Sequence, residues 1–305
     1  MDLIRRIKLR FRQDLRFDPL WIDEASAETQ LDRLDEDWMR RAAAALRDDG
    51  VAVLPGLVEP ALCATLCDEF RRYARASSAA AAPYRDDRGF HERLASFHMV
   101  SPTAQTIAQN ERLVRLLAVL LGEQPSIVSS LFFEKGSTQA IHRDTPWFFT
   151  NPLNHYFGVW TALEDVHPEA GPLTYFKGGH KVAPDRQLRD QRVPRDGYFA
   201  RIVEACVAAG LERVELCPRR GDVVIWHPQL PHGGAVRRDP ARTRCSMVVH
   251  YKAASAPIMG VAEFFSDQRR TPRFPSQPTI RLERLVAIDQ GAPRFFHNEL
   301  QGNFE

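Results

Sequence analysis

What the sequence lacks sets the first limits on this protein. No apolar run approaches the roughly 18 residues that a membrane-spanning helix needs. The first eight residues carry charges where a signal peptide needs its apolar stretch. The formal net charge is only +2, so no excess of one sign points to a nucleic-acid partner. We therefore expect a cytoplasmic protein whose partner is a small molecule and not a nucleic acid.

Cysteine is also scarce and badly spaced for a structural role. The chain has 5 cysteines, an odd number, and no pair has the C-x-x-C spacing of a metal or redox site. Disulfide frameworks are typical of small secreted domains, whereas isolated cysteines in a reducing cytosol usually pack as small apolar side chains. We expect the second situation here, and neither a zinc site nor a disulfide core.

The first 35 residues form a basic extension before the main domain, residues 36–305. Leu3, Ile7, Phe11 and Leu15 recur every four residues among arginines and a lysine, a pattern typical of an amphipathic helix. Such a helix either docks on its own domain or brings residues 1–16 to an anionic membrane surface. Both alternatives stay open at this point, and the oligomeric state cannot be read from the sequence.

The main domain has two parts of different character. Helices are expected at residues 36–46, 59–73 and 104–121, around a short buried strand at 50–56. From about residue 126 to 252, short β-rich runs alternate with Gly/Pro turns, which predicts an α+β protein with a double-stranded β-helix, or jelly-roll, core. The expected strands are 127–133, 140–144, 156–163, 173–176, 214–217, 223–226, 234–236 and 246–251. A charged insert at about 181–210 is expected to act as a lid, and the tail 253–305 is expected to wrap the barrel surface.

A candidate metal site lies within this β-rich part. Alternate side chains of a strand share a face, so His142 and Asp144 are expected to project together while Arg143 points away. His232, about ninety residues later, can complete the set from a second strand. Two imidazoles and one carboxylate are the ligands that hold non-haem Fe(II) and leave open positions. An arginine about a dozen residues further on can pair with the carboxylate of a co-substrate.

These motifs occur in an order that resembles a known family. Residues 50–251 resemble the phytanoyl-CoA dioxygenase family of Fe(II)/2-oxoglutarate oxygenases, and this resemblance covers about two thirds of the chain. The matching segments are Asp49–Gly56, His142–Asp144 with Gln139 upstream, Val159–Asp165, Gly171–Leu173, Gly178–His180, Gly221–Asp222, Pro231–Gly233 and His250–Tyr251.

The resemblance implies a role for each matched residue. His142, Asp144 and His232 would ligate Fe(II), and 2-oxoglutarate and O2 would be co-substrates. Arg244, with Arg242 as the fallback, would bind the far carboxylate of 2-oxoglutarate. Trp160 and Gln139 would line the same pocket. The implied reaction is oxidation, by hydroxylation in the simplest case, of a substrate C–H bond, with release of succinate and CO2. The family often has serine where this chain has Gly234, which removes one hydrogen bond of about 1 kcal/mol.

The substrate side of the site is predicted from position alone. Trp147 and Phe148 follow the metal segment, and Tyr198 lies in the charged insert, so these aromatic rings could contact a substrate or simply belong to the core. Arg189 and Arg192 in the same insert suggest an anionic substrate, with a solvated, internally paired loop as the alternative.

Two other function classes remain to be distinguished from an oxygenase. A metal-dependent isomerase or hydrolase on a cupin-like barrel would use the same three ligands but would not need the arginine. A non-catalytic binding protein of the same fold would keep the barrel without the chemistry. Release of succinate distinguishes the oxygenase from the isomerase or hydrolase. Metal binding distinguishes it from the non-catalytic binding protein.

Overall fold

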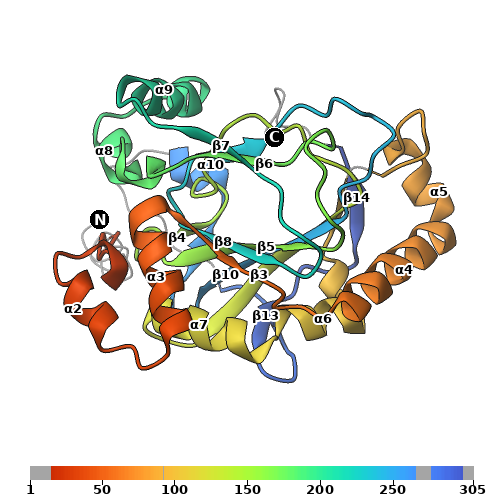
Figure 1. Cartoon of the computed structure of the whole chain (residues 1–305), viewed down its shortest axis with the longest axis horizontal. Helices are drawn as coiled ribbons and strands as arrows, with labels where there is room; N and C mark the ends of the chain where they lie inside the picture. Colours follow the sequence, from red (N-terminus) through yellow and green to blue (C-terminus); the bar gives the residue numbers. More distant parts are fainter. Residues whose placement is uncertain (1–14, 92, 266–275, 298–305) are drawn as a thin grey trace, which may run out of the picture.

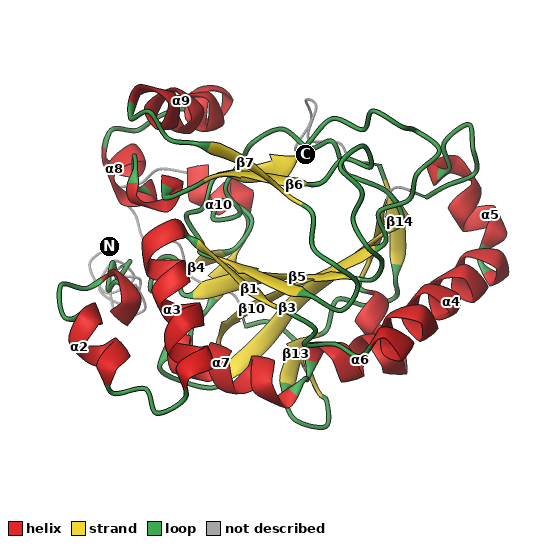
Figure 2. Ribbon diagram, viewed as in Figure 1, coloured by secondary structure: helices red, strands yellow, loops and turns green. Residues whose placement is uncertain are grey.

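The computed structural model describes residues 15–91, 93–265 and 276–297. Helices lie against one side of a large sheet, and a smaller sheet faces its other side (Figure 1, Figure 2). Within these ranges, no helix has the length and apolar character needed to cross a bilayer. The α-helices are α2 (Ala27–Asp32), α3 (Asp37–Asp49), α4 (Pro60–Ala76), α5 (Ser78–Ala81), α6 (Pro102–Ala108), α7 (Glu111–Leu121), α8 (Asp185–Asp190), α9 (Arg195–Ala208) and α10 (Val261–Phe265). Short 3-10 turns are η1 (Trp21–Asp23), η2 (Ala82–Tyr84), η3 (Phe97–Met99) and η4 (Gly179–Lys181).

Two facing sheets form the jelly roll that the sequence predicts. The main sheet has the order β1-β8-β5-β10-β3-β13-β12, with β2 also paired to β3 and β14 paired to β2, and the small sheet has the order β7-β6-β9. A further pair joins β4 and β11. The strands are β1 (Val51–Leu54), β2 (Arg93–Ala95), β3 (Pro125–Phe133), β4 (Phe149–Thr150), β5 (Tyr156–Ala162), β6 (Leu173–Phe176), β7 (Arg213–Leu216), β8 (Val223–Trp226), β9 (His232–Gly234), β10 (Ser246–Ala253), β11 (Ile258–Met259), β12 (Thr279–Arg281), β13 (Val286–Ile288) and β14 (Arg294–Phe296).

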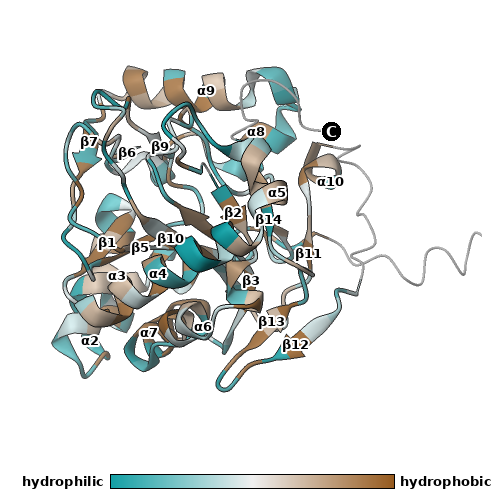
Figure 3. Cartoon of the chain, turned by 90° about the vertical axis from the view of Figure 1, so that its right-hand side faces the viewer, coloured by the Kyte–Doolittle hydropathy of each residue, from teal (hydrophilic) through white to brown (hydrophobic). Residues whose placement is uncertain are grey.

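The central strands are covered on both faces, which explains their composition. Every residue of β5 and of β10 is buried. One face packs on the helices and the other on the small sheet, so the strands read as apolar runs and not as an alternation with polar residues. Figure 3 shows brown, hydrophobic stretches along these strands. The residues predicted to form the metal site therefore lie next to a largely apolar frame.

Local signals determine where the helices end, and one prediction was wrong. Residues 104–121 form two helices, α6 and α7, and not one. The Asn110 side chain accepts a hydrogen bond from the Leu113 amide at 3.2 Å and so starts α7 as an N-cap. Helix α3 ends at Gly50, whose φ of +80° suits glycine. A Cβ there would also lie 2.5 Å from Nδ1 of His180, so this position has no room for a side chain.

The ends of the chain differ from their predicted roles in part. The apolar stripe at Leu3, Ile7 and Phe11 lies outside the described residues, and so does most of the segment 1–16. Residues 15–35 dock on the domain: the indole of Trp21 donates to the carbonyl of Val119 at 2.8 Å. The tail was expected only to wrap the surface, but β13 pairs in parallel with β3 and extends the main sheet. The insert forms α8 and α9 beside the small sheet (Figure 2).

Candidate active site

The first metal motif does not lie in a regular strand, contrary to the expectation for residues 140–144. Only one isolated antiparallel bridge forms, in which His142 and His232 exchange backbone hydrogen bonds of 2.8 and 2.9 Å. His232 itself belongs to β9, which begins two residues earlier than predicted. Gly233 permits this close approach, because a Cβ there would lie 2.6 Å from the carbonyl oxygen of Gln139. The bridge thus brings the two motifs together directly, without a longer ladder.

The three predicted ligands converge on one point. One ligand atom from each of His142, Asp144 and His232 lies within 4.8 Å of the others, and all three residues are buried. Nδ1 of His142 lies 2.8 Å from the carbonyl of Ala140, and Nδ1 of His232 lies 2.9 Å from the carbonyl of Leu230. A proton on each Nδ1 satisfies these carbonyls and leaves a lone pair on each Nε2. On His142 this lone pair accepts from the Gln139 amide nitrogen at 2.9 Å, and a metal would take its place.

The charge balance of the site suits a divalent cation. Burial by itself raises the pKa of Asp144, but the nearby imidazoles of His232, His142 and His250 hold that pKa well below its ordinary value. Burial lowers the pKa of His232 to about 4, against the opposing effect of Asp144. At neutral pH the site therefore presents one carboxylate and a neutral His232, the states in which these groups bind metal.

Two further side chains hold the carboxylate, and neither was predicted. The indole nitrogen of Trp226 donates to Oδ2 of Asp144 at 2.9 Å, and Nε2 of His250 lies 3.2 Å from the same oxygen. Strand β5 lies between β8 and β10, and its Gly158 is paired with both Trp226 and His250. A Cβ on Gly158 would lie 2.1 Å from the Trp226 ring. Gly158 therefore makes room for the indole to reach Asp144. Only the cross-strand pairing reveals this, since the three residues are far apart in the sequence.

The arginine predicted for the co-substrate faces the same cavity. A cavity of about 70 Å³ is lined by the triad and by Arg244, Trp160 and Gln139, among others. Burial, together with the guanidinium groups of Arg93 and Arg237, lowers the pKa of Arg244 to about 10, so it stays charged at neutral pH. Among the described residues no carboxylate pairs with Arg244, whose Nη1 donates to the carbonyl of Gly171 at 2.8 Å and whose buried Nε has no partner.

The fallback arginine lies elsewhere. The side chain of Arg242 is 43% exposed and pairs with Asp239 at 3.1 Å and with Glu169 at 3.8 Å. It does not line the cavity. The structure therefore corrects this alternative and leaves Arg244 as the candidate. Gln139 lines the cavity, where its amide nitrogen lies 2.9 Å from Nε2 of His142 and its oxygen accepts from Arg93 at 2.7 Å.

The predicted substrate residues separate into two groups. Trp147 lies edge-on to His142, with ring centroids 5.7 Å apart, and stacks on Phe199 of α9 at 5.6 Å with an interplanar angle of 4°. Phe199 also lies edge-on to His142 at 6.2 Å. Phe148 stacks on His250 at 3.9 Å. These rings form an aromatic wall beside the metal ligands.

The insert residues predicted at the substrate do not face it. Tyr198 is buried and donates to Oδ1 of Asp185 at 2.6 Å. Arg189 is buried too, where it donates to the carbonyl of Phe264 and lies between the rings of Phe264 and Phe149. Arg192 is exposed and does not line the cavity that contains the triad. The prediction that Arg189 faces an anionic substrate was wrong, because its long apolar stem and planar head fill an aromatic pocket in the core.

Arg143, between the two ligands, anchors the insert. Its side chain is fully buried and points away from the metal site, as predicted. It donates to the carbonyls of Gly179, Val182 and Ala183 at 2.6 to 3.1 Å and to Asp185 at 3.0 Å. Because Tyr198 donates to the same carboxylate, Arg143 ties α8 and α9 to the metal segment.

Comparison with known proteins agrees with this architecture. Residues 46–243 match the family model described as phytanoyl-CoA dioxygenase (PhyH). The chain belongs to the phytanoyl-CoA dioxygenase family. The resemblance of the motifs is thereby confirmed, although the family match ends one residue before Arg244. Family membership supports an oxygenase as the general kind of enzyme.

The relatives extend the comparison. The mouse phytanoyl-CoA dioxygenase domain-containing protein 1 is 25% identical over 190 residues, which cover 60% of this chain and 63% of that protein. The Bos taurus protein of the same name is 32% identical over 98 residues, 30% of this chain and 33% of its own. The chain thus spans less than two thirds of the length of these relatives.

Solved structures confirm the fold. The epimerase SnoN, crystallised with Fe3+, alpha ketoglutarate and nogalamycin RO, superposes with a TM-score of 0.58 at 20% identity, over 82% of this chain and 98% of its own. EctD from S. alaskensis with bound Fe gives 0.59 at 21% identity, over 81% and 85% of the two chains. The residues of this chain fit such ligands on their own evidence. The two imidazoles and the carboxylate of the triad suit iron, and the buried Arg244, which has no carboxylate partner among the described residues, suits a carboxylate.

Proposed function

We propose that this protein is an Fe(II)- and 2-oxoglutarate-dependent dioxygenase that oxidises, most simply by hydroxylation, a C–H bond of a small molecule. The observation that carries the proposal is the placement of Arg244 in the same cavity as the triad, buried, charged and without a carboxylate partner among the described residues. A buried guanidinium in this state needs an anion. A metal-dependent isomerase or hydrolase has no co-substrate carboxylate that requires such an arginine.

The residues of the chain would divide the work as follows. His142, Asp144 and His232 would hold iron, which supplies O2 activation coupled to the conversion of 2-oxoglutarate to succinate and CO2. Trp226 and His250 would fix the orientation of Asp144. Arg244 would hold the far carboxylate of 2-oxoglutarate, with Trp160 packed beside it at 5.5 Å from the guanidinium carbon to the ring centroid. The apolar frame would exclude water from the reacting groups.

The aromatic wall of Trp147 and Phe199 suggests the character of the substrate. These rings flank His142, where a substrate C–H bond would have to lie, and the arginine predicted to hold an anion, Arg189, is turned into the core. We therefore infer a substrate that presents an apolar face to the metal. Screening compounds for succinate release, with Phe199→Ala as comparison, tests this: a substrate whose KM is unchanged by the variant would contradict the inference.

The cofactor half of the proposal can be tested without knowing the substrate. Fe(II) and 2-oxoglutarate are added to the protein without oxygen, and a weak visible metal-to-ligand charge-transfer band is expected. His142→Ala should abolish the band. Arg244→Met should raise the 2-oxoglutarate concentration needed, while Arg242→Met, a matched change two residues away on the surface, should not. Iron binding without the band would favour the isomerase or hydrolase, and no metal binding would favour a non-catalytic protein.

A further inference from the structure

A second and larger cavity lies apart from the metal site. Its volume is about 430 Å³, against about 70 Å³ for the metal cavity, and the two share no lining residue. Pockets for small organic molecules commonly have volumes of roughly 300–1,000 Å³. Its walls are the segment 17–24, Arg47 at the end of α3, Leu153 and Asn154, the segment 180–186 and Gln229. We name it the back cavity.

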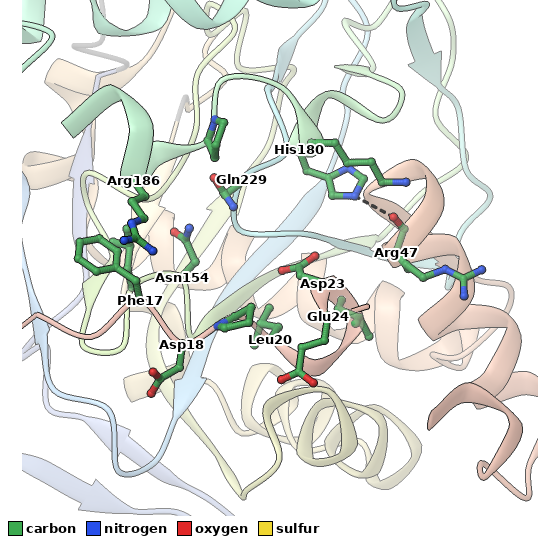
Figure 4. A pocket seen from close by; sticks show the side chains of 15 residues that line it. Phe17, Asp18, Leu20, Asp23, Glu24, Arg47, Asn154, His180, Arg186 and Gln229 are labelled. Atoms are coloured by element: carbon green, nitrogen blue, oxygen red, sulfur yellow. Dashed lines mark hydrogen bonds between the residues drawn. The ribbon is translucent and has the colours of Figure 1, made fainter. Parts of the chain in front are cut away.

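The walls of the back cavity carry opposite charges. The segment 17–24 contributes the carboxylates of Asp18, Asp23 and Glu24. The segment 180–186 contributes Lys181 and Arg186. Arg47 at the end of α3 is a further cation of the wall, but it pairs with Glu28 and Asp48. Figure 4 shows Arg186 near Asn154 and Gln229, with Asp18, Asp23 and Glu24 along the segment 17–24. A ligand between these walls meets cations from one segment and anions from another.

These charges do not pair across the cavity among the described residues. Asp23 pairs instead with His227 at 3.0 Å, and Arg186 with Asp190 at 3.9 Å on its own helix. The guanidinium of Arg186 also lies over the ring of Phe17, 4.7 Å from its centroid, so its contact with the opposite wall is with an aromatic ring and not with a carboxylate. The amide oxygen of Gln229 accepts from the Asp185 backbone at 2.9 Å, which leaves its amide nitrogen available as a donor. The amide of Asn154 likewise uses only its oxygen. The cavity thus keeps donors for an anionic group and carboxylates for a cationic group.

The same walls are bonded to the residues on either side of Asp144. Thr145 donates to Asn154 at 2.9 Å. Arg143 donates to the carbonyls of Val182 and Ala183 and to Asp185, within the segment that ends at Arg186. A ligand that stabilises these walls therefore also stabilises the position of the metal-binding carboxylate, and linkage makes the effect reciprocal.

We propose that the back cavity is a second ligand site for a small zwitterion, a molecule with a carboxylate at one end and an ammonium group at the other, and that its occupancy is coupled to metal binding. The carboxylate lies toward Arg186, Gln229 and Asn154, and the ammonium group lies toward Asp23 and Glu24. The site does not depend on the reaction proposed for the metal cavity.

Three four-carbon probes test the charge requirement on the full-length protein. Titrations with 4-aminobutyrate, butyrate and butylamine are followed by ligand-observed NMR. The zwitterion should bind about tenfold more tightly than either singly charged probe. If butyrate or butylamine binds as well as 4-aminobutyrate, or if none binds at millimolar concentration, the zwitterion site is wrong.

Variants then locate the site. Glu24→Gln and Arg186→Gln should each weaken 4-aminobutyrate binding by roughly fivefold, the effect of losing one partly exposed ion pair. Arg192→Gln, which removes an exposed arginine of the same insert outside the cavity, should have no effect. Equal effects of all three variants would place the probe elsewhere.

A metal titration tests the coupling. Saturating 4-aminobutyrate should tighten Co(II) binding to the wild-type protein severalfold, read from the visible spectrum of the bound metal. At a probe concentration near the wild-type Kd, where a fivefold loss of affinity lowers the occupancy, the shift should be clearly smaller in Glu24→Gln than in the wild-type protein. Probe binding with no change in Co(II) affinity would overturn the coupling.

Discussion

The two faces of residues 142–145 do opposite work. On one face, His142 and Asp144 direct polar atoms toward a common point and leave them available for a metal. On the other face, Arg143 and Thr145 donate hydrogen bonds to neighbouring loops. The backbone between them is almost without regular pairing, held by one bridge to His232. The comparison teaches that a metal segment needs no long strand if its alternate side chains are anchored from behind.

Substitutions on the face that carries His142 and Asp144 should affect metal binding far more than folding. Asp144→Asn should weaken Co(II) or Fe(II) binding by more than about a hundredfold, because the only carboxylate of the triad is lost. The free energy of unfolding of the metal-free protein should change by about 1 kcal/mol, since the amide oxygen still accepts from Trp226. Metal titration and urea unfolding measure the two effects. Equal affinity in the variant would remove Asp144 from the ligand set.

The face that carries Arg143 and Thr145 should affect folding more than metal binding. Arg143→Met should lower the free energy of unfolding by about 3–5 kcal/mol, because it leaves the buried carboxylate of Asp185 without its cation. Denaturant unfolding measures this. The double variant Arg143→Met/Asp185→Leu is the control and should recover part of the loss. A single variant as stable as wild type would show that the pair does not anchor the insert.

Acid should lower the free energy of unfolding through His180, which lines the back cavity. Burial and the neighbouring His227 lower the pKa of His180 to about 3, below the ordinary value near 6.5. The unfolded chain therefore binds this proton more readily, and stability falls as the pH drops from about 6.5 toward 3. The loss from this group by pH 4 is on the order of 3 kcal/mol.

The variant His180→Gln isolates that effect. It should flatten the decline in unfolding free energy between pH 6.5 and 4, while the amide can still donate to the carbonyl of Arg47, as the imidazole does. His167→Gln, at a side chain that is 44% exposed, is the matched control and should leave the pH profile unchanged. If both variants titrate like wild type, His180 is not the group responsible.

The support of Asp144 by its neighbours should give the smallest effect. Trp226→Phe removes the indole hydrogen bond of 2.9 Å and should weaken metal binding about tenfold without changing the ligand set. Trp160→Phe alters the same cavity at a ring for which no hydrogen bond to Asp144 occurs, and it should leave metal affinity unchanged in the absence of 2-oxoglutarate. Identical affinities in the two variants would mean that the indole does not support Asp144.

Much of the fold could be predicted because its signals are local. Seven of the eight expected strands of the barrel appear near their predicted positions, since apolar runs between Gly/Pro turns have few other ways to bury themselves. The exception is 140–144, which is positioned by the backbone bridge between His142 and His232. A local sequence pattern cannot reveal a contact between residues so far apart. The division of residues 104–121 was missed because the capping by Asn110 was overlooked within an apolar helix pattern.

The sequence predicted the candidate site residues that belong to a recognisable motif. It missed those that only the fold brings close to that motif. His142, Asp144 and His232 were found by residue type and order, and Arg244 by its place in the family pattern. Trp226, His250 and Gly158 were not found, because only their alignment on β8, β10 and β5 brings them to Asp144. Arg189 was placed at the substrate because its charge was visible while the aromatic pocket around it was not.

The sequence by itself determined the jelly-roll class, the family and the chemistry of the candidate metal ligands, because strand alternation and residue type are properties of short segments. The tertiary structure decided which arginine lies in the metal cavity, which side chains orient the carboxylate, and that a second cavity of mixed charge lies behind the metal segment. These depend on where distant segments meet and which groups that meeting removes from water, and both are set by packing across the whole chain.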